Sequence, residues 1–504
     1  MKHAFTERAA ILALSFAIAA GAASVGADPA TAASDYLKRI DALDKNGPQI
    51  NAVITINNMA PALARRAHKK GLPLDGRTVL IKDNIETFEW PTTAGSLALK
   101  ENNTERDAPL IARLRASGGV VLGKTNLSEW ANFRSNTSTS GWSGVGGLTR
   151  NPHALDRTAC GSSAGSGAAV AAGFAWAAIG TETNGSVTCP ASVNGIVGFK
   201  PTVGMVSRTH VVPISASQDT AGPMTRDVTA AAQLLSAIAG HDPADPATRD
   251  ADQYAIDFTL GLADYSLKGV RIGVMREQVG SNSGVKALFE QALKDLEHAG
   301  VVLVDIEYDW PDDYGRVAYE SLLFEFRRDI NAYLASLPGE ALPKTLDDLV
   351  TFNQAHAESE LRWFDQALFL NALRFTDEDA YAKGRAATLR ASGPDGIDRL
   401  LGEHKVEFLI APTAGPAWSI DLVNGDNFNG SIGAGSLPAR AGYPHLTVPM
   451  GAVERLPVGL SIISGKWQDA AVLKAGAAYE RARSATLANP AFEVWHPNAS
   501  GVKP

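Results

Sequence analysis

The chain has 504 residues, with 46 lysines and arginines against 54 aspartates and glutamates, and a formal net charge of −8 at pH 7. Hydrophobic residues make up 45% and charged residues 20%, values typical of globular proteins, which excludes collagen-like, coiled-coil and wholly disordered chains. The acidic balance argues against a general nucleic-acid-binding protein, which needs a basic face to neutralise phosphates. Two cysteines, Cys160 and Cys189, are too few for a disulfide scaffold or a four-thiolate zinc site.

Residues 1–27 have the pattern of a secretory signal peptide. Lys2 and Arg8 give a basic start, an apolar run covers residues 9–23, and small residues lead to a cleavage site near Ala27. The alternative is a retained membrane anchor, but the run is rich in alanine and glycine, which insert poorly. No other apolar run reaches about 18 residues, so we expect a bacterial chain exported to the periplasm or medium, without membrane contact after cleavage.

Export would bring Cys160 and Cys189 into an oxidising compartment, where the two can pair. From the sequence we nevertheless expect two free, buried thiols, because an unpaired cysteine packs like a small apolar side chain.

After the signal peptide, helical and extended patterns alternate. Apolar residues at helical spacing predict helices over residues 32–43, 60–70, 108–116, 284–298 and 469–484. Short apolar or alternating runs predict strands over residues 50–56, 77–85, 120–122, 270–275, 301–307, 406–412 and 458–463. The alternation favours an α/β fold in which helices cover a largely parallel sheet.

The chain from residue 28 to 504 is interpreted as one domain. Its core comprises about residues 30–305 and 396–490, and residues 306–395, rich in aromatic side chains, form a mostly helical elaboration. A plain helical core is favoured for this elaboration over a cap that faces substrate.

Two short motifs are judged by their context. Residues 118–125, GGVVLGKT, satisfy the P-loop pattern, but a helix precedes them and branched residues occupy the phosphate cradle, so nucleotide binding is not expected. Residues 161–165, GSSAG, satisfy G-x-S-x-G, which requires a hydrophobic strand running into Ser163. Residues 150–159 read as a loop, which disfavours an α/β-hydrolase using His404 or His445; both are expected to be ordinary polar or partly buried histidines.

A lysine can replace histidine as the base of a nucleophilic serine, provided that it is neutral. Lys82 ends the apolar run of residues 79–81, and burial there would lower its pKa. Asp83 would point to the opposite face of an extended strand. Taken locally, a lysine reaching out to solvent is the simpler interpretation.

Several longer stretches, in one order, resemble the amidase signature family. They are residues 79–84, 123–129, 160–167, 180–191, 195–201 and 217–226, with a weaker echo at 411–412 and 444–459. The match covers about residues 30–240. Within the family, the ETNGSVTCP and SQDT stretches are most similar to the bacterial peptide amidases.

The resemblance implies a large mixed β-sheet core flanked by helices on both faces. It also implies a triad in which Ser186 is the nucleophile, Ser162 relays its proton after a cis peptide bond, and Lys82 is the base. Backbone N–H groups of the oxyanion hole then fall on Thr183, Asn184, Gly185 and Ser186. Many relatives have glycine in place of Asn184, but asparagine tolerates left-handed backbone angles.

The expected function is cofactor-free hydrolysis of a carboxamide through an acyl-enzyme, with C-terminal peptide amides converted to acid and ammonia. The alternatives are an aryl-acylamide or small-carboxamide amidase, and the amidotransferase subunit of tRNA-dependent amidation. The signal peptide and the mature charge of about −9 argue against the second alternative. No metal site and no nucleic-acid partner are expected, and the substrate-binding residues and oligomeric state do not follow from the sequence.

Overall fold

The computed structural model describes residues 28–428 and 430–497. The predicted signal peptide, residues 1–27, lies outside the described residues. In the part of the chain that the structure describes, no helix is both long and apolar enough to cross a membrane.

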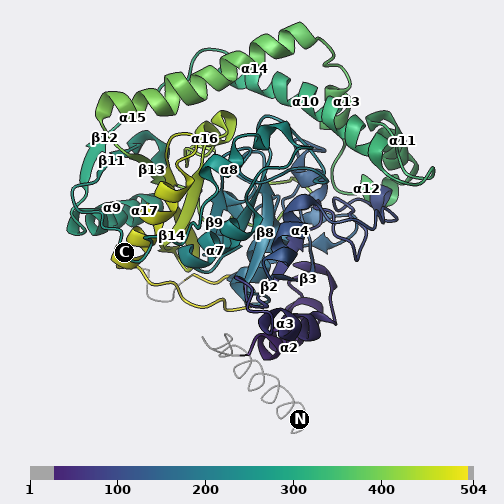
Figure 1. The fold of residues 1–504 in the computed structure, drawn as a ribbon. Helices are drawn as coiled ribbons and strands as arrows, with labels where there is room; N and C mark the ends of the chain where they lie inside the picture. Colours follow the sequence, from purple (N-terminus) through teal and green to yellow (C-terminus); the bar gives the residue numbers. More distant parts are fainter. Residues whose placement is uncertain (1–27, 429, 498–504) are drawn as a thin grey trace.

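An eleven-stranded sheet runs through the centre of the molecule (Figure 1). Its order is β1 (Val53–Ile56), β3 (Val120–Thr125), β2 (Thr78–Lys82), β8 (Ala177–Glu182), β10 (Thr220–Thr225), β9 (Val197–Lys200), β14 (His445–Val453), β15 (Leu456–Ile463), β13 (Phe408–Pro412), β11 (Arg271–Val274) and β12 (Val302–Asp305). Two short ribbons pair β4 (Trp142–Ser143) with β5 (Gly147–Leu148), and β6 (Arg150–Asn151) with β7 (Ala154–Thr158).

The sheet is mixed: six of its strand pairs are antiparallel and four are parallel. The largely parallel sheet expected from the alternation is therefore wrong, and the mixed sheet implied by the resemblance is confirmed. Alternation requires only that helices cover the faces, whereas strand direction depends on each connection. The turn between β14 and β15, Glu454 and Arg455, is too short for anything but an antiparallel pair.

Helices cover both faces of the sheet. The side chains of β2 alternate between two cores: Val79 and Ile81 pack on one face, and Leu80 packs on the other. The first core includes residues of α4 (Pro109–Ala116), α7 (Val228–Ile238), α9 (Ser283–His298) and α17 (Asp469–Ala482). The second includes residues of α2 (Pro29–Ile40), α3 (Ala60–His68), α5 (Ala164–Ala172) and α6 (Thr188–Val193).

A helical layer lies over one edge of this core, at the top of Figure 1. It comprises α10 (Tyr314–Ser336), α11 (Leu346–Ala355), α12 (Ala357–Glu360), α13 (Ala367–Ala372), α14 (Glu378–Ser392) and α15 (Arg399–His404). Apolar residues of this layer, among them Phe326 and Phe369, share one core with Trp130 and Phe133 of the sheet domain. Two short helices, α8 (Ala251–Tyr254) and α16 (Ser436–Ala441), lie closer to the sheet.

The structure corrects one interpretation of the middle of the chain. Residues 154–158, interpreted as loop, form strand β7. This strand belongs to a two-stranded ribbon outside the main sheet, so it does not place Ser163 at a sheet edge as the G-x-S-x-G motif requires. Residues 120–125 form β3, a buried strand, which is where the P-loop pattern would need a phosphate cradle.

Candidate active site

The candidate site lies where two parallel neighbours, β2 and β8, end. Because parallel strands end at the same edge of a sheet, Lys82 at the end of β2 and Glu182 at the end of β8 lie near each other. The chain continues from Glu182 directly into the predicted oxyanion loop, residues 183–186. One edge of the sheet therefore gathers the predicted base and the predicted nucleophile from sites 104 residues apart.

The two predicted catalytic serines lie in neighbouring loops. Ser162 precedes α5 and Ser186 precedes α6, and the N–H of Ser163 donates a hydrogen bond of 3.1 Å to the carbonyl oxygen of Ser186. In the described part of the chain the Ser186 hydroxyl forms no hydrogen bond, and the residue is partly exposed. Its hydroxyl is thus free to meet a substrate.

A disulfide joins Cys160 and Cys189, so the expectation of two free thiols is wrong. The cysteines are 29 residues apart in the sequence, but their Cα atoms lie 6.1 Å from each other because the two serine loops meet. A separation along the chain does not reveal such a meeting. The cross-link closes a loop that contains both Ser162 and Ser186.

Lys82 is completely buried, and its ammonium nitrogen contacts hydroxyl and carbonyl oxygens. Its Nζ lies 2.8 Å from the hydroxyl of Ser162, 2.8 Å from the hydroxyl of Thr181 and 3.2 Å from the carbonyl oxygen of Thr181. The amide of Asn84 donates to the same Thr181 hydroxyl at 3.0 Å. The interpretation of Lys82 as a lysine reaching to solvent is excluded by this burial.

Burial lowers the pKa of Lys82 to about 7, and the negative charges of Asp219 and Glu182 only partly offset this effect. An ordinary lysine, with a pKa of 10.5, is protonated at neutral pH and cannot accept a proton. A pKa near 7 leaves much of Lys82 neutral, with a lone pair directed at a neighbour. Of the two hydroxyls that it contacts, those of Ser162 and Thr181, only that of Ser162 belongs to the loop that meets the Ser186 loop, so Ser162 is the neighbour that can pass a proton between Ser186 and Lys82.

The predicted orientation of Asp83 also agrees with the structure. Asp83 forms an ion pair with Lys124 of β3, at 3.1 Å, and does not contact Lys82. Asp83 is the first residue of the turn that follows β2, and its N–H donates to the carbonyl oxygen of Thr125, so its carboxylate lies on the β3 side, away from the base.

The peptide bond between Gly161 and Ser162 is cis. A Cβ atom on Gly161 would lie 2.1 Å from the Ser128 hydroxyl, so only glycine fits there. The N–H of Ser128 in turn donates to the carbonyl oxygen of Ser162 at 3.0 Å. Ser128 thus holds the backbone of Ser162, the predicted relay serine, from one side.

The predicted oxyanion loop has free donors. Within the described residues, the N–H groups of Asn184, Gly185 and Ser186 have no acceptor. The left-handed backbone angle falls on Gly185, with φ of 84°, and not on Asn184. Asn184 is therefore unstrained, and its side chain reaches the hydroxyl of Ser436 at 3.2 Å.

Three residues near the base were missed as site residues by the sequence analysis. The hydroxyl of Thr181 contacts Lys82, and Asn84 donates to that hydroxyl. Glu182 accepts the N–H groups of the two residues directly after Ser186, at 2.8 and 3.0 Å. The run Ala177–Ile179 at the start of β8 was a usable signal, but the surrounding glycines obscured the strand. Without β8, nothing placed Thr181 beside Lys82.

The histidines considered as bases lie elsewhere. His445 is buried in β14 with its Nε2 2.6 Å from the Ser461 hydroxyl, and His404 ends α15.

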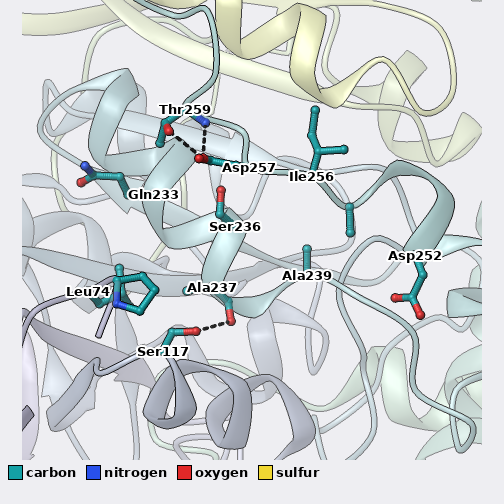
Figure 2. Close-up of a pocket in the computed structure, with 12 residues that line it drawn as sticks. Leu74, Ser117, Gln233, Ser236, Ala237, Ala239, Asp252, Ile256, Asp257 and Thr259 are labelled. Carbon is teal, nitrogen blue, oxygen red and sulfur yellow. Dashed lines mark hydrogen bonds between the residues drawn. The ribbon is translucent and has the colours of Figure 1, made fainter. Parts of the chain in front are cut away.

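A cavity of about 620 Å³ is also separate from the predicted site (Figure 2). Residues of α7 and of the segment after it line this cavity, and the hydroxyl of Ser117 donates to the carbonyl oxygen of Ala237 within it.

Comparison with known proteins places the chain among amide-processing enzymes. The amidase family model matches residues 32–473. Native peptide amidase of Stenotrophomonas maltophilia is 44% identical, with a TM-score of 0.87, and the match covers 92% of this chain and 96% of that one. A complex of the peptide amidase PAM with the competitive inhibitor chymostatin has the same identity, score and coverage. A glutamyl-tRNA(Gln) amidotransferase subunit from Caldanaerobacter subterraneus is 34% identical over 468 residues, 89% of this chain and 91% of that protein.

Proposed function

Given that this chain belongs to the amidase family of amide-hydrolysing enzymes, we propose that it removes ammonia from C-terminal peptide amides through a Ser186–Ser162–Lys82 relay. The observation that carries the proposal is the buried Lys82, whose pKa lies near 7 and whose nitrogen contacts the Ser162 hydroxyl at 2.8 Å.

The relay begins with neutral Lys82. It takes the proton of the Ser162 hydroxyl as Ser162 takes that of Ser186; for this step the Ser186 hydroxyl, which has no hydrogen bond among the described residues, must turn to donate to Ser162. The Ser186 oxygen then attacks the carbonyl carbon of the substrate. The carbonyl oxygen becomes an oxyanion and accepts hydrogen bonds from the free N–H groups of residues 184–186.

Collapse of this intermediate breaks the carbon–nitrogen bond. The proton held by Lys82 returns through Ser162 to the leaving nitrogen, which departs as ammonia and leaves an acyl-enzyme on Ser186. Water then attacks the ester: it gives one proton to the relay, the acid is released, and the proton is returned to the Ser186 oxygen. The relay is thus unchanged after one turnover.

The choice of substrate rests on similarity. Peptide amidase is 44% identical to this chain, whereas the amidotransferase subunit is 34% identical. The inhibitor complex of peptide amidase supports a small amide or peptide as the ligand of this fold. The predicted signal peptide further favours an exported, periplasmic or secreted enzyme over one that meets tRNA, and the aryl-acylamide or small-carboxamide amidase remains the alternative with the same chemistry.

The test uses purified mature protein and a short peptide amide, with ammonia and free amino acids measured together. We expect ammonia without amino acids, and its loss in Ser186→Ala and in Lys82→Ala. Ser163→Ala is the matched control, since Ser163 is the nucleophile of the G-x-S-x-G alternative; its hydroxyl only bridges backbone groups of Thr181. That variant should keep ammonia release within about tenfold of the parent protein.

Each other outcome has a definite meaning. Turnover of an anilide or small carboxamide, with no ammonia from peptide amides, would keep the relay and discard the substrate. Ammonia release that survives Ser186→Ala would overturn the mechanism. Activity that requires glutamyl-tRNA and further protein components would favour the amidotransferase.

A further inference from the structure

Asp219 lies directly before β10 and contacts the predicted oxyanion loop. Its Oδ1 accepts a hydrogen bond of 2.5 Å from the hydroxyl of Thr183, the first residue of that loop. Its Oδ2 accepts the N–H groups of Ile214 and Ser215, at 2.7 and 2.8 Å. The carboxylate therefore ties Thr183 to a second loop, residues 214–219.

The helical layer holds this second loop from the other side. Glu325 of α10 accepts from the hydroxyl of Ser217 at 2.8 Å and from the hydroxyl of Ser215. Asp329, one turn further along α10, accepts the N–H of Ala216 at 2.9 Å. The loop that carries Asp219 is thus fixed at several points, so Asp219 is a firm anchor for Thr183.

Asp219 also acts on Lys82 through its charge. Burial has the largest effect on the pKa of Lys82 and lowers it. The negative charges of Asp219 and, to a smaller extent, Glu182 act in the opposite direction and raise it. Burial raises the pKa of Asp219 itself to about 6. The hydrogen bonds that Asp219 accepts from Thr183 and from its own loop, and the positive charge of Arg208, lower this pKa but do not cancel the effect of burial. The Arg208 guanidinium is paired with Asp245, so it neutralises Asp219 incompletely.

We propose that Asp219 is a positioning residue of the hydrolytic site: it orients the oxyanion loop through Thr183, and its carboxylate lines the same small cavity as Asn84 and Thr181, the residues beside Lys82. This inference rests on the proposed Ser186–Ser162–Lys82 relay.

The oxyanion loop leaves its own N–H groups free for substrate, so side chains must hold it. Glu182 holds the residues after it, Gln218 donates to the carbonyl oxygen of Thr183 at 3.3 Å, and Asp219 is the carboxylate that holds the Thr183 side chain. Two carboxylates then fix the loop. Asp219 holds Thr183, which precedes the turn at Gly185, and Glu182 accepts the N–H groups of the two residues that follow Ser186.

The test compares Asp219→Asn with the parent enzyme in pH profiles of kcat and kcat/KM for a peptide amide. Loss of the negative charge lowers the pKa of Lys82, so the acid limb should move to lower pH, by about half a unit or more. At the pH optimum kcat should fall by about 10- to 100-fold because the oxyanion donors are less well placed, with KM changed by less than about threefold.

Two further variants separate position from charge. Thr183→Val removes the hydroxyl and keeps the carboxylate, so kcat should fall while the acid limb stays in place, and Thr183→Ser should restore activity. Asp329→Asn is the matched control, because it neutralises another carboxylate that accepts an N–H from the same loop; its acid limb should not move.

The outcomes distinguish a failure of the role inferred for Asp219 from a failure of the proposed relay. An acid limb that stays in place in a folded Asp219→Asn, or that moves equally in Asp329→Asn, overturns the charge effect. A kcat unchanged in Thr183→Val overturns the positioning role, and that variant decides it even if Asp219→Asn does not fold. Activity that survives Ser186→Ala instead removes the relay on which the inference depends.

Discussion

Two lysines on neighbouring parallel strands, Lys82 of β2 and Lys124 of β3, are both fully buried but have different partners. Lys124 contacts the carboxylate of Asp83 at 3.1 Å, the carbonyl oxygen of Ile85 at 2.7 Å and the hydroxyl of Thr92 at 3.0 Å. Burial lowers the pKa of Lys124, and the charge of Asp83 opposes this effect directly. Among the residues that the structure describes, Lys82 contacts only hydroxyl and carbonyl oxygens.

The difference shows that burial alone does not make a lysine a base. The carboxylate of Asp83, in contact with Lys124, opposes the lowering of its pKa by burial, and the pair secures Asp83 and the loop after β2. Lys82 lacks such a contact, so it can be neutral and act on Ser162. The turn that begins at Asp83, directly after β2, directs this carboxylate to Lys124 and leaves Lys82 without it.

The largest expected effect separates the two lysines. Lys82→Met should lower kcat/KM for a peptide amide by about 10³-fold or more while the fold is kept, because the relay loses its base. Lys124→Met should instead reduce the free energy of unfolding by about 3–5 kcal/mol, since it leaves Asp83 buried and unpaired. Kinetics and chemical denaturation of both variants provide the measurement. Equal losses of activity per folded molecule would contradict the contrast.

The pH dependence is the next effect in size. In the proposed relay neutral Lys82 is the active form, so kcat/KM should rise about tenfold per pH unit below the lysine's pKa of about 7 and level off above it. Glu182 and Asp219 are the charged groups that oppose the lowered pKa. A profile flat from pH 5 to about pH 8 would argue against lysine as the base.

The same lowered pKa makes stability depend on pH. Between the folded pKa of about 7 and the ordinary value of 10.5, the unfolded chain binds a proton at Lys82 that the folded chain does not. The parent protein should therefore gain stability relative to Lys82→Met as pH rises through this window, by up to about 1.4 kcal/mol per pH unit, and lose it as pH falls toward 7. Denaturation curves of both proteins across the window test the sign.

Two isosteric threonine-to-valine changes compare a partner of Lys82 with a partner of Asp83, the carboxylate that contacts Lys124. Thr181→Val removes a hydroxyl that contacts Lys82, and should lower kcat/KM by about tenfold. Thr93→Val removes a hydroxyl that donates to Asp83 on the other face, and should cost about 1–3 kcal/mol of stability with activity preserved. Steady-state rates and thermal melts on both proteins suffice. An activity loss in Thr93→Val as large as that in Thr181→Val would erase the distinction.

The smallest expected effect on activity concerns two adjacent positions of the predicted oxyanion loop, Asn184 and Gly185. Asn184→Gly should change kcat/KM by less than about threefold, because Asn184 does not occupy the left-handed region. Gly185→Ala places a side chain at φ of 84°, where no atom lies within 4 Å, so strain of about 1–2 kcal/mol acts alone and the rate should fall by up to about tenfold. The rates of the two variants, measured together, show which residue forms the turn.

The strongly periodic elements could be predicted from the sequence with small shifts at their ends. The helix predicted over residues 284–298 is α9, Ser283–His298, and the closing helix predicted from Asp469 is α17. In contrast β8, β9 and β10 escaped prediction, because glycine interrupts all three patterns and proline also interrupts that of β10. These strands form the middle of the sheet, so strand order and direction could not be derived either.

By itself the sequence determined which side chains can carry the chemistry: the ordered motifs singled out Lys82, Ser162 and Ser186, and the period of two along the strand predicted that Asp83 points away from the base. Only the tertiary structure decided that Lys82 is buried, that Thr181, Glu182 and Asp219 surround the site, and that Cys160 pairs with Cys189. The physical reason is that desolvation, charge proximity and cross-linking depend on distances between residues far apart in the chain. Those distances are fixed when the parallel strands β2 and β8 end at one edge of the sheet.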